Sequence, residues 1–206
     1  MTMSSRRDLL AAGLAAAALG LAAPAAAAPL LGEAAPAFSA VDADGRTRSL
    51  SEFKGKTVVL EWTNEGCPYV QKHYGAGAMQ ALQKKAVGQG VVWLTLVSSA
   101  PGKQGHLSGQ AAKGWKAKQK AAYTALLLDP KGDVGRAYDA KTTPHMYIID
   151  PAGTLVYTGG IDDRPTPDPA SLKGAKNYVV AALDDLAAGR PVAEPATRPY
   201  GCSVKY

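Results

Sequence analysis

Apolar and polar residues recur along the chain in two periods, one typical of strands and one typical of helices. Short apolar runs rich in β-branched residues predict buried strands at Thr57–Trp62, Val91–Val97 and Ala125–Leu128. Helices are predicted from Pro68 onward and at Ala78–Ala86, Gln110–Tyr123, Asp133–Asp139 and Leu172–Ala188. A hairpin is predicted from Met146–Asp150 and Thr154–Gly159. This order predicts an α/β fold, with a central mixed sheet flanked by helices.

The pattern changes after Pro191. Residues 191–206 contain further prolines and cannot build a core, yet they end in two tyrosines, a valine and a cysteine. About a dozen extended residues reach roughly 40 Å, enough to cross a domain of this size. We therefore expect a domain at 36–190 and an extended C-terminal tail, 191–206, that docks on it and places Cys202.

The N-terminal residues have the composition of a targeting signal. Arg6 and Arg7 precede Leu9-Leu10 and an Ala/Leu-rich stretch that runs to Ala28. The arginine pair is typical of a twin-arginine signal peptide, here 1–27, with cleavage near Ala28. An ordinary secretory signal and an uncleaved membrane anchor are the alternatives. The expected location is periplasmic or secreted.

Charge and cysteine content narrow the function classes. The formal net charge is +6 and the isoelectric point is about 9.3, with lysines concentrated in 113–120. No basic stripe is interleaved with aromatic residues, so we expect no nucleic-acid partner. The chain has two cysteines, and an exported protein permits disulfide chemistry between them.

Cys67 is the strongest candidate for chemistry. It lies between the predicted strand Thr57–Trp62 and a helix that begins with Pro68, which suits the first turn of a helix. Unpaired backbone N–H groups and the helix dipole lower the pKa of a thiol at this place and make it nucleophilic. The alternative is an inert core cysteine, but such a residue usually lies inside an apolar run.

Cys202 is the other cysteine, and two roles remain open for it. It can act as the resolving thiol for Cys67, or it can staple the tail to the domain through a structural disulfide. A crosslink across this span stabilises a fold by about 5 kcal/mol in the chain-entropy model.

Three stretches resemble a known family. They are Gly66-Cys-Pro-Tyr-Val-Gln-Lys-His-Tyr74, Thr143-Pro-His-Met-Tyr-Ile-Ile-Asp150 and the ending Gly201-Cys-Ser-Val-Lys205. The chain from about Pro36 to Arg190 resembles the thioredoxin fold, and more specifically the redoxin (AhpC/TSA-type) branch in its peroxiredoxin-like group. The resemblance implies a cis peptide bond before Pro144 and places Thr143-Pro144 beside Cys67.

The chain also departs from these families. A thioredoxin has a second cysteine where this chain has Val70. A peroxiredoxin has a proline and a hydroxyl residue where this chain has Leu60 and Asn64, the nearest hydroxyl being that of Thr63. The arginine that activates peroxide is also missing from the position that aligns with Pro144. These departures make efficient peroxide reduction an open question.

The resulting prediction is an exported thiol-dependent oxidoreductase with antioxidant, peroxiredoxin-like activity. Its catalytic residues would be Cys67 and Cys202, and the residues that support substrate or thiolate would be Thr63, Asn64, Glu65, Thr143 and Pro144. We expect no cofactor and no metal. The partners would be a peroxide or a protein disulfide and a thiol reductant of unidentified type.

Three alternatives remain at this stage. The first is thiol-disulfide exchange. The second is copper binding by Cys67, His73, His145 and Met146, which lacks the usual Cys-x-x-x-Cys pair because position 71 is glutamine. The third is a redoxin module that binds a partner without catalysis. Lys72 and His73 are interpreted as part of a solvated helix face.

Overall fold

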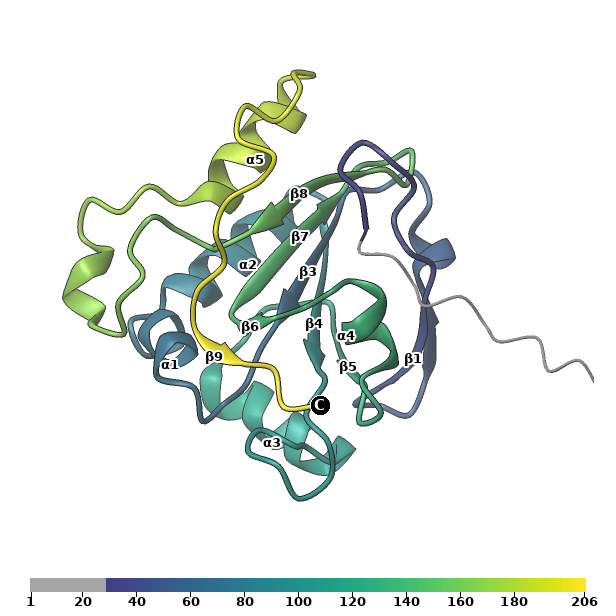
Figure 1. Cartoon of the computed structure of the whole chain (residues 1–206), viewed down its shortest axis with the longest axis vertical. Helices are drawn as coiled ribbons and strands as arrows, with labels where there is room; N and C mark the ends of the chain where they lie inside the picture. Colours follow the sequence, from purple (N-terminus) through teal and green to yellow (C-terminus); the bar gives the residue numbers. More distant parts are fainter. Residues whose placement is uncertain (1–28) are drawn as a thin grey trace, which may run out of the picture.

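The computed structural model describes residues 29–206, so the predicted signal peptide 1–27 lies outside the described part of the chain. Seven strands form one mixed sheet in the order β2-β1-β5-β4-β3-β7-β8 (Figure 1). These are β1 (Ser39–Asp42), β2 (Thr47–Ser49), β3 (Val58–Trp62), β4 (Val92–Val97), β5 (Ala125–Leu128), β7 (His145–Ile149) and β8 (Leu155–Gly159). The central strands β3, β4 and β5 are parallel, and the outer strands are antiparallel to their neighbours. The predicted mixed sheet is confirmed.

Helices cover both faces of the sheet. The helices are α1 (Pro68–Gly75), α2 (Ala78–Gly88), α3 (Gly109–Gln119), α4 (Asp133–Ala137) and α5 (Tyr178–Ala187). Apolar residues of α1, α2, α3 and α5 pack with one set of strand side chains, whereas α4 packs with the other set. Strands β3 and β4 are therefore buried along their whole length, which explains their continuous apolar runs.

The terminal helix is shorter than predicted. The segment expected as one helix, Leu172–Ala188, starts at the last residue of a short 3-10 helix, η2 (Pro169–Leu172), and becomes helical again as α5 from Tyr178 onward. Between them Gly174 has a left-handed φ of +71°, and the Asn177 side chain caps α5 by accepting a hydrogen bond from the Val180 amide. A left-handed residue breaks helix geometry, so the apolar spacing continues through two separate elements.

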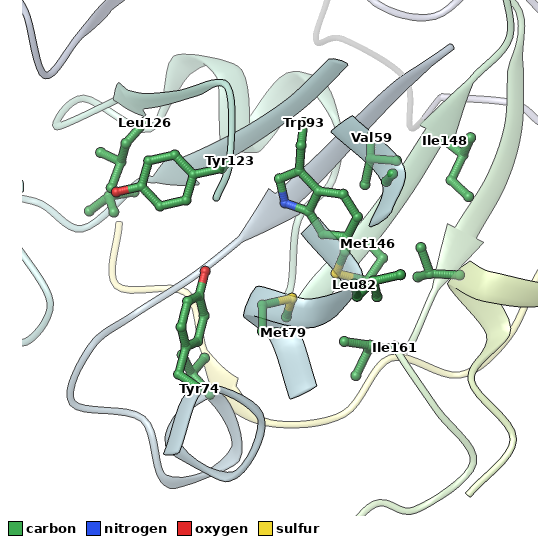
Figure 2. Packing of buried hydrophobic residues seen from close by; sticks show 14 of the residues in the cluster. Val59, Tyr74, Met79, Leu82, Trp93, Tyr123, Leu126, Met146, Ile148 and Ile161 are labelled. Carbon is green, nitrogen blue, oxygen red and sulfur yellow. The ribbon is translucent and has the colours of Figure 1, made fainter. Parts of the chain in front are cut away.

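The largest core joins the sheet to the helices that carry the site. Figure 2 shows Trp93 and Val59 of the sheet packing against Met79 and Leu82 of α2. A carboxylate, Glu61 of β3, is fully buried in the same region. It accepts hydrogen bonds from four side chains, those of Tyr74, Gln83, Trp93 and Thr95, at 2.8–3.1 Å. Burial raises the pKa of Glu61 and outweighs these hydrogen bonds, which act in the opposite direction.

The tail lies across the domain, as its sequence suggested. In Figure 1 it runs back from α5 past β8 and forms β9 (Cys202–Ser203) beside β6 (Thr142–Thr143). A parallel bridge joins Thr158 of β8 to Ala196 of the tail. Backbone hydrogen bonds therefore fix the tail at more than one point along its length. Within residues 29–206, no helix has the length and apolar character needed to cross a membrane.

Candidate functional site

Cys67 occupies the N-cap position of α1, where the chain leaves β3. Its backbone N–H donates to the Asn64 carbonyl at 3.0 Å, and the Asn64 side chain accepts from the Gly66 amide at 2.9 Å. These two hydrogen bonds close a tight turn, and Pro68 then begins the helix. The Cys67 side chain is completely buried. The strand–turn–helix predicted from the sequence is therefore present, but the thiol is covered.

The peptide bond between Thr143 and Pro144 is cis, as the family resemblance implied. Thr143 lies directly against the thiol, and its carbonyl accepts a hydrogen bond from Cys67 Sγ at 3.1 Å. The segment that contains Thr143 and Pro144 thus forms one wall around the sulfur of Cys67.

Cys202 covers the thiol from the tail. Strand β9 pairs antiparallel with β6 so that Cys202 lies opposite Thr143, and the Sγ atoms of Cys67 and Cys202 are 2.7 Å apart. Both cysteines are thiols in this structure, and Cys202 is only partly buried. A disulfide bond is about 2.05 Å long, so the two sulfurs need only a small movement to reach bonding distance when the pair is oxidised. The tail supplies the partner that α1 lacks at Val70.

A glycine permits this close approach. Gly201 has a φ of +136°, a conformation that other residues rarely adopt. A β-carbon at this position would collide with the carbonyl oxygen of Thr143. Residue 201 must therefore be glycine for β9 to reach β6 and place Cys202 over Cys67.

The two thiols have different acidities. Burial raises the pKa of Cys67, but hydrogen bonds from the Cys202 thiol, the Thr143 side chain and the Val70 and Cys202 amides outweigh it, so the net pKa is below that of an ordinary cysteine. Burial and the neighbouring Cys67 raise the pKa of Cys202 to about 11. Cys67 is therefore the more acidic thiol of the pair.

The remaining predicted site residues are distributed unevenly around the sulfurs. Thr63 is buried, and its hydroxyl has no hydrogen-bond partner in the described part of the chain. Asn64 shapes the turn and also donates to the Gln104 carbonyl at 3.2 Å. The Glu65 side chain is exposed, and only its backbone carbonyl takes part in a hydrogen bond, from Gln71. The structure thus brings together Cys67, Cys202, Thr143 and Pro144, with Glu65 outside this group.

Lys72 and His73 do not belong to a solvated helix face, and that interpretation is wrong. Both side chains are buried, with exposed fractions of 0% and 2%, and both face Asp162 and Tyr200. Sequence reasoning missed Asp162. The two tyrosines in the tail were the signal for docking, and Tyr200 is one of the residues through which the tail docks.

A cavity of about 570 Å³ lies beside the tail, and neither Cys67 nor Cys202 lines it. Its lining includes Thr142, Asp162, Arg198 and Gly201. This volume is within the range of small-molecule sites. Within residues 29–206, no three His, Cys, Asp or Glu side chains are grouped so that they could hold a metal ion.

Comparisons with known proteins agree with this geometry. Residues 31–158 match the AhpC/TSA family. An uncharacterized conserved protein from Geobacillus kaustophilus is 28% identical, with a TM-score of 0.72 over 86% of this chain and 92% of its own. A hypothetical protein from Sinorhizobium meliloti is 24% identical, with a TM-score of 0.73 over 87% of this chain and 96% of its own.

A third solved structure, a putative thiol:disulfide interchange protein from Chlorobium tepidum, is 24% identical, with a TM-score of 0.55 over 76% of this chain and 99% of its own. The comparison with curated proteins gives no match. The family match and the structural likeness confirm the predicted thioredoxin-like fold.

Proposed function

Because the chain belongs to the AhpC/TSA family, whose members are generally thiol-dependent oxidoreductases, we propose that it exchanges disulfides through a Cys67–Cys202 pair. The protein would cycle between the dithiol seen here and an intramolecular disulfide. The observation that carries this proposal is the 2.7 Å separation of the two sulfur atoms. The substrates would be thiols and disulfides of proteins or small molecules.

The chemistry follows from the different acidities of the two thiols. In the oxidised protein, a substrate thiolate attacks Cys202 Sγ and breaks the disulfide, and Cys67 leaves as a thiolate. A second substrate thiolate then attacks the substrate sulfur of the mixed disulfide, which forms the substrate disulfide and releases Cys202. A low pKa makes Cys67 the better leaving group, and a high pKa makes Cys202 take up a proton on release.

The exposure of the two sulfurs supports the same assignment. Cys67 is completely buried under the tail, whereas Cys202 is only partly buried. An attacking thiolate therefore reaches Cys202 more easily than Cys67 while the tail is docked. In this proposal Cys202 takes part in chemistry and does more than staple the tail.

Single cysteine variants test the proposal. We expect Cys67→Ser and Cys202→Ser each to abolish catalysed exchange between glutathione and a model disulfide, whereas both should retain the fold. Turnover should be followed together with mass spectrometry of the Cys67–Cys202 peptide under non-reducing conditions. Full turnover in Cys202→Ser, accompanied by a loss of thermal stability, would show that Cys202 is only a structural clamp.

Peroxide reduction is the second candidate. Two features favour it, membership of the AhpC/TSA family and the unpartnered, buried Thr63 hydroxyl in the described structure. In this reaction Cys67 attacks a peroxide oxygen, an alcohol or water leaves, and Cys202 resolves the sulfenic acid as water is released. The hydrogen-bond partners of Cys67 within residues 29–206 include no arginine. Peroxide consumption with a dithiol reductant, compared with the exchange rate, ranks the two reactions.

We also propose that the protein is exported to an oxidising compartment, where disulfides persist. The support is the Arg6-Arg7 signal in the sequence. Protein isolated from its native host should begin near Ala28 in an intact-mass measurement. A cytoplasmic form that keeps residues 1–27 would contradict export.

A further inference from the structure

Four polar side chains form a buried group between α1 and the tail, here called the Tyr200 cluster. Its members are Lys72, His73, Asp162 and Tyr200, with exposed fractions of 9% or less. The Tyr200 hydroxyl donates a short hydrogen bond to Asp162, and it lies 3.2 Å from Lys72 Nζ and 3.3 Å from His73 Nε2. Lys72 Nζ also forms an ion pair with Asp162 at 3.5 Å. The tail residue thus completes a network that belongs to the domain.

The Tyr200 cluster, like the cysteine pair, joins residues of α1 to a residue of the tail. Cys67 is the N-cap of α1, and Lys72 and His73 follow on this helix about one and a half turns later, so roughly 8–9 Å along the helix axis separates them from Cys67. On the tail, Tyr200 precedes Cys202 by two residues, or about 7 Å of extended chain. Because these two spacings are similar, the tail can run alongside α1 and contact it at both Tyr200 and Cys202.

Because the Lys72–Asp162 ion pair is buried, its stability depends on the docked tail. An ion pair without water needs further hydrogen bonds to offset the loss of solvation. Lys72 Nζ donates to the Arg164 carbonyl at 2.7 Å and to the Tyr200 hydroxyl oxygen, and Asp162 accepts from Tyr200. If the tail left, water would have to replace the Tyr200 hydroxyl on both charges. The buried ion pair therefore favours the docked tail, in which the Tyr200 hydroxyl bonds both Lys72 and Asp162.

We propose that Tyr200, held by Lys72 and Asp162, is a positioning residue that keeps Cys202 in contact with Cys67 and keeps Cys67 covered. This inference rests on the proposed function, in which the two cysteines form the reacting pair. It assigns a role in the redox centre to buried charged residues that touch neither sulfur. Release of the phenol would let the tail lift, expose Cys67 and separate the thiols.

Alkylation of Cys67 measures this release. In a Cys202→Ser background, Tyr200→Phe should increase the iodoacetamide rate at Cys67 roughly tenfold or more, because a hydrogen bond to a charged group is lost. The matched control is Tyr138→Phe, which also removes one buried hydroxyl, bonded to the Pro36 carbonyl at 2.7 Å and away from the tail. The control should keep the parent rate. Asp162→Asn serves as a second variant and should act in the same direction as Tyr200→Phe.

The pH profile gives a second readout in protein with both cysteines. Release of the tail removes both the burial of Cys67 and the hydrogen bonds from Cys202, and because the net pKa of the covered thiol is below that of an ordinary cysteine, Tyr200→Phe should move the midpoint of Cys67 alkylation to higher pH. If Tyr200→Phe lowers thermal stability but leaves both Cys67 readouts at parent values, Tyr200 is only a structural contact. Equal rate increases in Tyr200→Phe and Tyr138→Phe would also overturn the proposal. Either result leaves the proposed function standing if turnover still requires Cys202.

Discussion

At the scale of single residues, the site depends on one position that tolerates no side chain. Gly201 combines a φ of +136° with close approach to the carbonyl of Thr143. The neighbouring Cys202 reaches Cys67 only because this approach is possible. The contact between the two cysteines therefore depends on a residue that has no side chain.

Gly201→Ala should separate the two sulfurs. The added methyl group collides with Thr143, so β9 must move away from β6, and formation of the Cys67–Cys202 disulfide should slow at least tenfold. This rate is measured by quenching the oxidation at successive times and analysing the samples by non-reducing mass spectrometry. The control is Gly174→Ala, a left-handed glycine with no atom near its missing side chain, which should lose about 1 kcal/mol of stability and keep the disulfide rate. Equal disulfide rates in both variants would contradict the steric argument.

His145 should stay neutral well below its usual pKa. Burial lowers its pKa to about 4, and its Nδ1 accepts a hydrogen bond from the Lys141 amide at 3.3 Å, which requires an unprotonated nitrogen. The unfolded chain binds this proton near pH 6.5, so the contribution of His145 is present above that pH and is lost as pH falls to about 4. The loss amounts to about 3 kcal/mol.

Two measurements check this prediction. The imidazole proton shifts of His145 in an NMR titration should not move between pH 7 and 5. The unfolding free energy of His145→Gln should depend less steeply on pH between 6.5 and 4 than that of the parent protein. A midpoint near 6.5 in the folded protein would contradict the assignment.

At the scale of elements, the tail has anchors on both sides of Cys202. Tyr200 anchors it to α1, and Tyr206 anchors its end to α4. The Tyr206 ring lies over the Arg136 guanidinium at 4.6 Å, and its hydroxyl donates to the Ala140 carbonyl at 2.7 Å. Gly132 and Gly135 leave space for the ring, since a β-carbon at either position would strike it. The short strand β9 is thus held by contacts that lie outside the strand itself.

Tyr206→Ala should loosen the end of the tail. The Val204 amide donates to the Lys141 carbonyl at 3.0 Å, and its hydrogen exchange should become roughly tenfold faster when the ring contact and the hydroxyl bond are lost. Hydrogen-exchange NMR reports on this amide directly. Val41→Ala, which truncates an exposed side chain on β1, is the control and should leave that amide unchanged. Unchanged exchange in Tyr206→Ala would show that Tyr206 does not anchor the tail.

At the scale of the whole molecule, a buried carboxylate connects the sheet to the helices that carry the site. Glu61 of β3 accepts from Tyr74 on α1, from Gln83 on α2, and from Trp93 and Thr95 on β4. Each donor is buried and would lose its partner if the carboxylate were removed. The packing of α1 on the sheet, and so the position of Cys67, depends on this group.

Glu61→Leu should destabilise the fold by about 3–5 kcal/mol, because it leaves buried donors without an acceptor. Glu61→Gln keeps one acceptor oxygen and should lose less. Urea unfolding followed by tryptophan fluorescence measures both values. A loss below about 1 kcal/mol in Glu61→Leu would show that the donors find other partners.

Much of the fold could be predicted from the sequence because the periodicity and length of an apolar run depend on neighbouring residues in the chain. The runs at Thr57–Trp62 and Val91–Val97 are apolar on both faces, and the structure places them in the centre of the sheet. The predicted helix Leu172–Ala188 is too long because the spacing of apolar residues carries no information about the left-handed conformation of Gly174. Lys72 and His73 were misplaced for a different reason. Charged residues are usually exposed, and the partners that offset the burial of Lys72 and His73, among them Asp162 and Tyr200, are distant in the sequence.

By itself, the sequence determined the α/β order of elements, the position of Cys67 between a strand and a helix, and a tail with apolar residues and a second cysteine. These features depend on residues near one another in the chain, where steric and hydrophobic preferences act directly. The tertiary structure decided that Cys202 meets Cys67, that the Thr143 carbonyl lies against the Cys67 thiol, and that Tyr200 closes a buried charged cluster. The contacts that Cys67 and Lys72 make with Thr143, Cys202 and Tyr200 join residues more than 70 positions apart, so they exist only once the sheet has formed and the tail has docked on it.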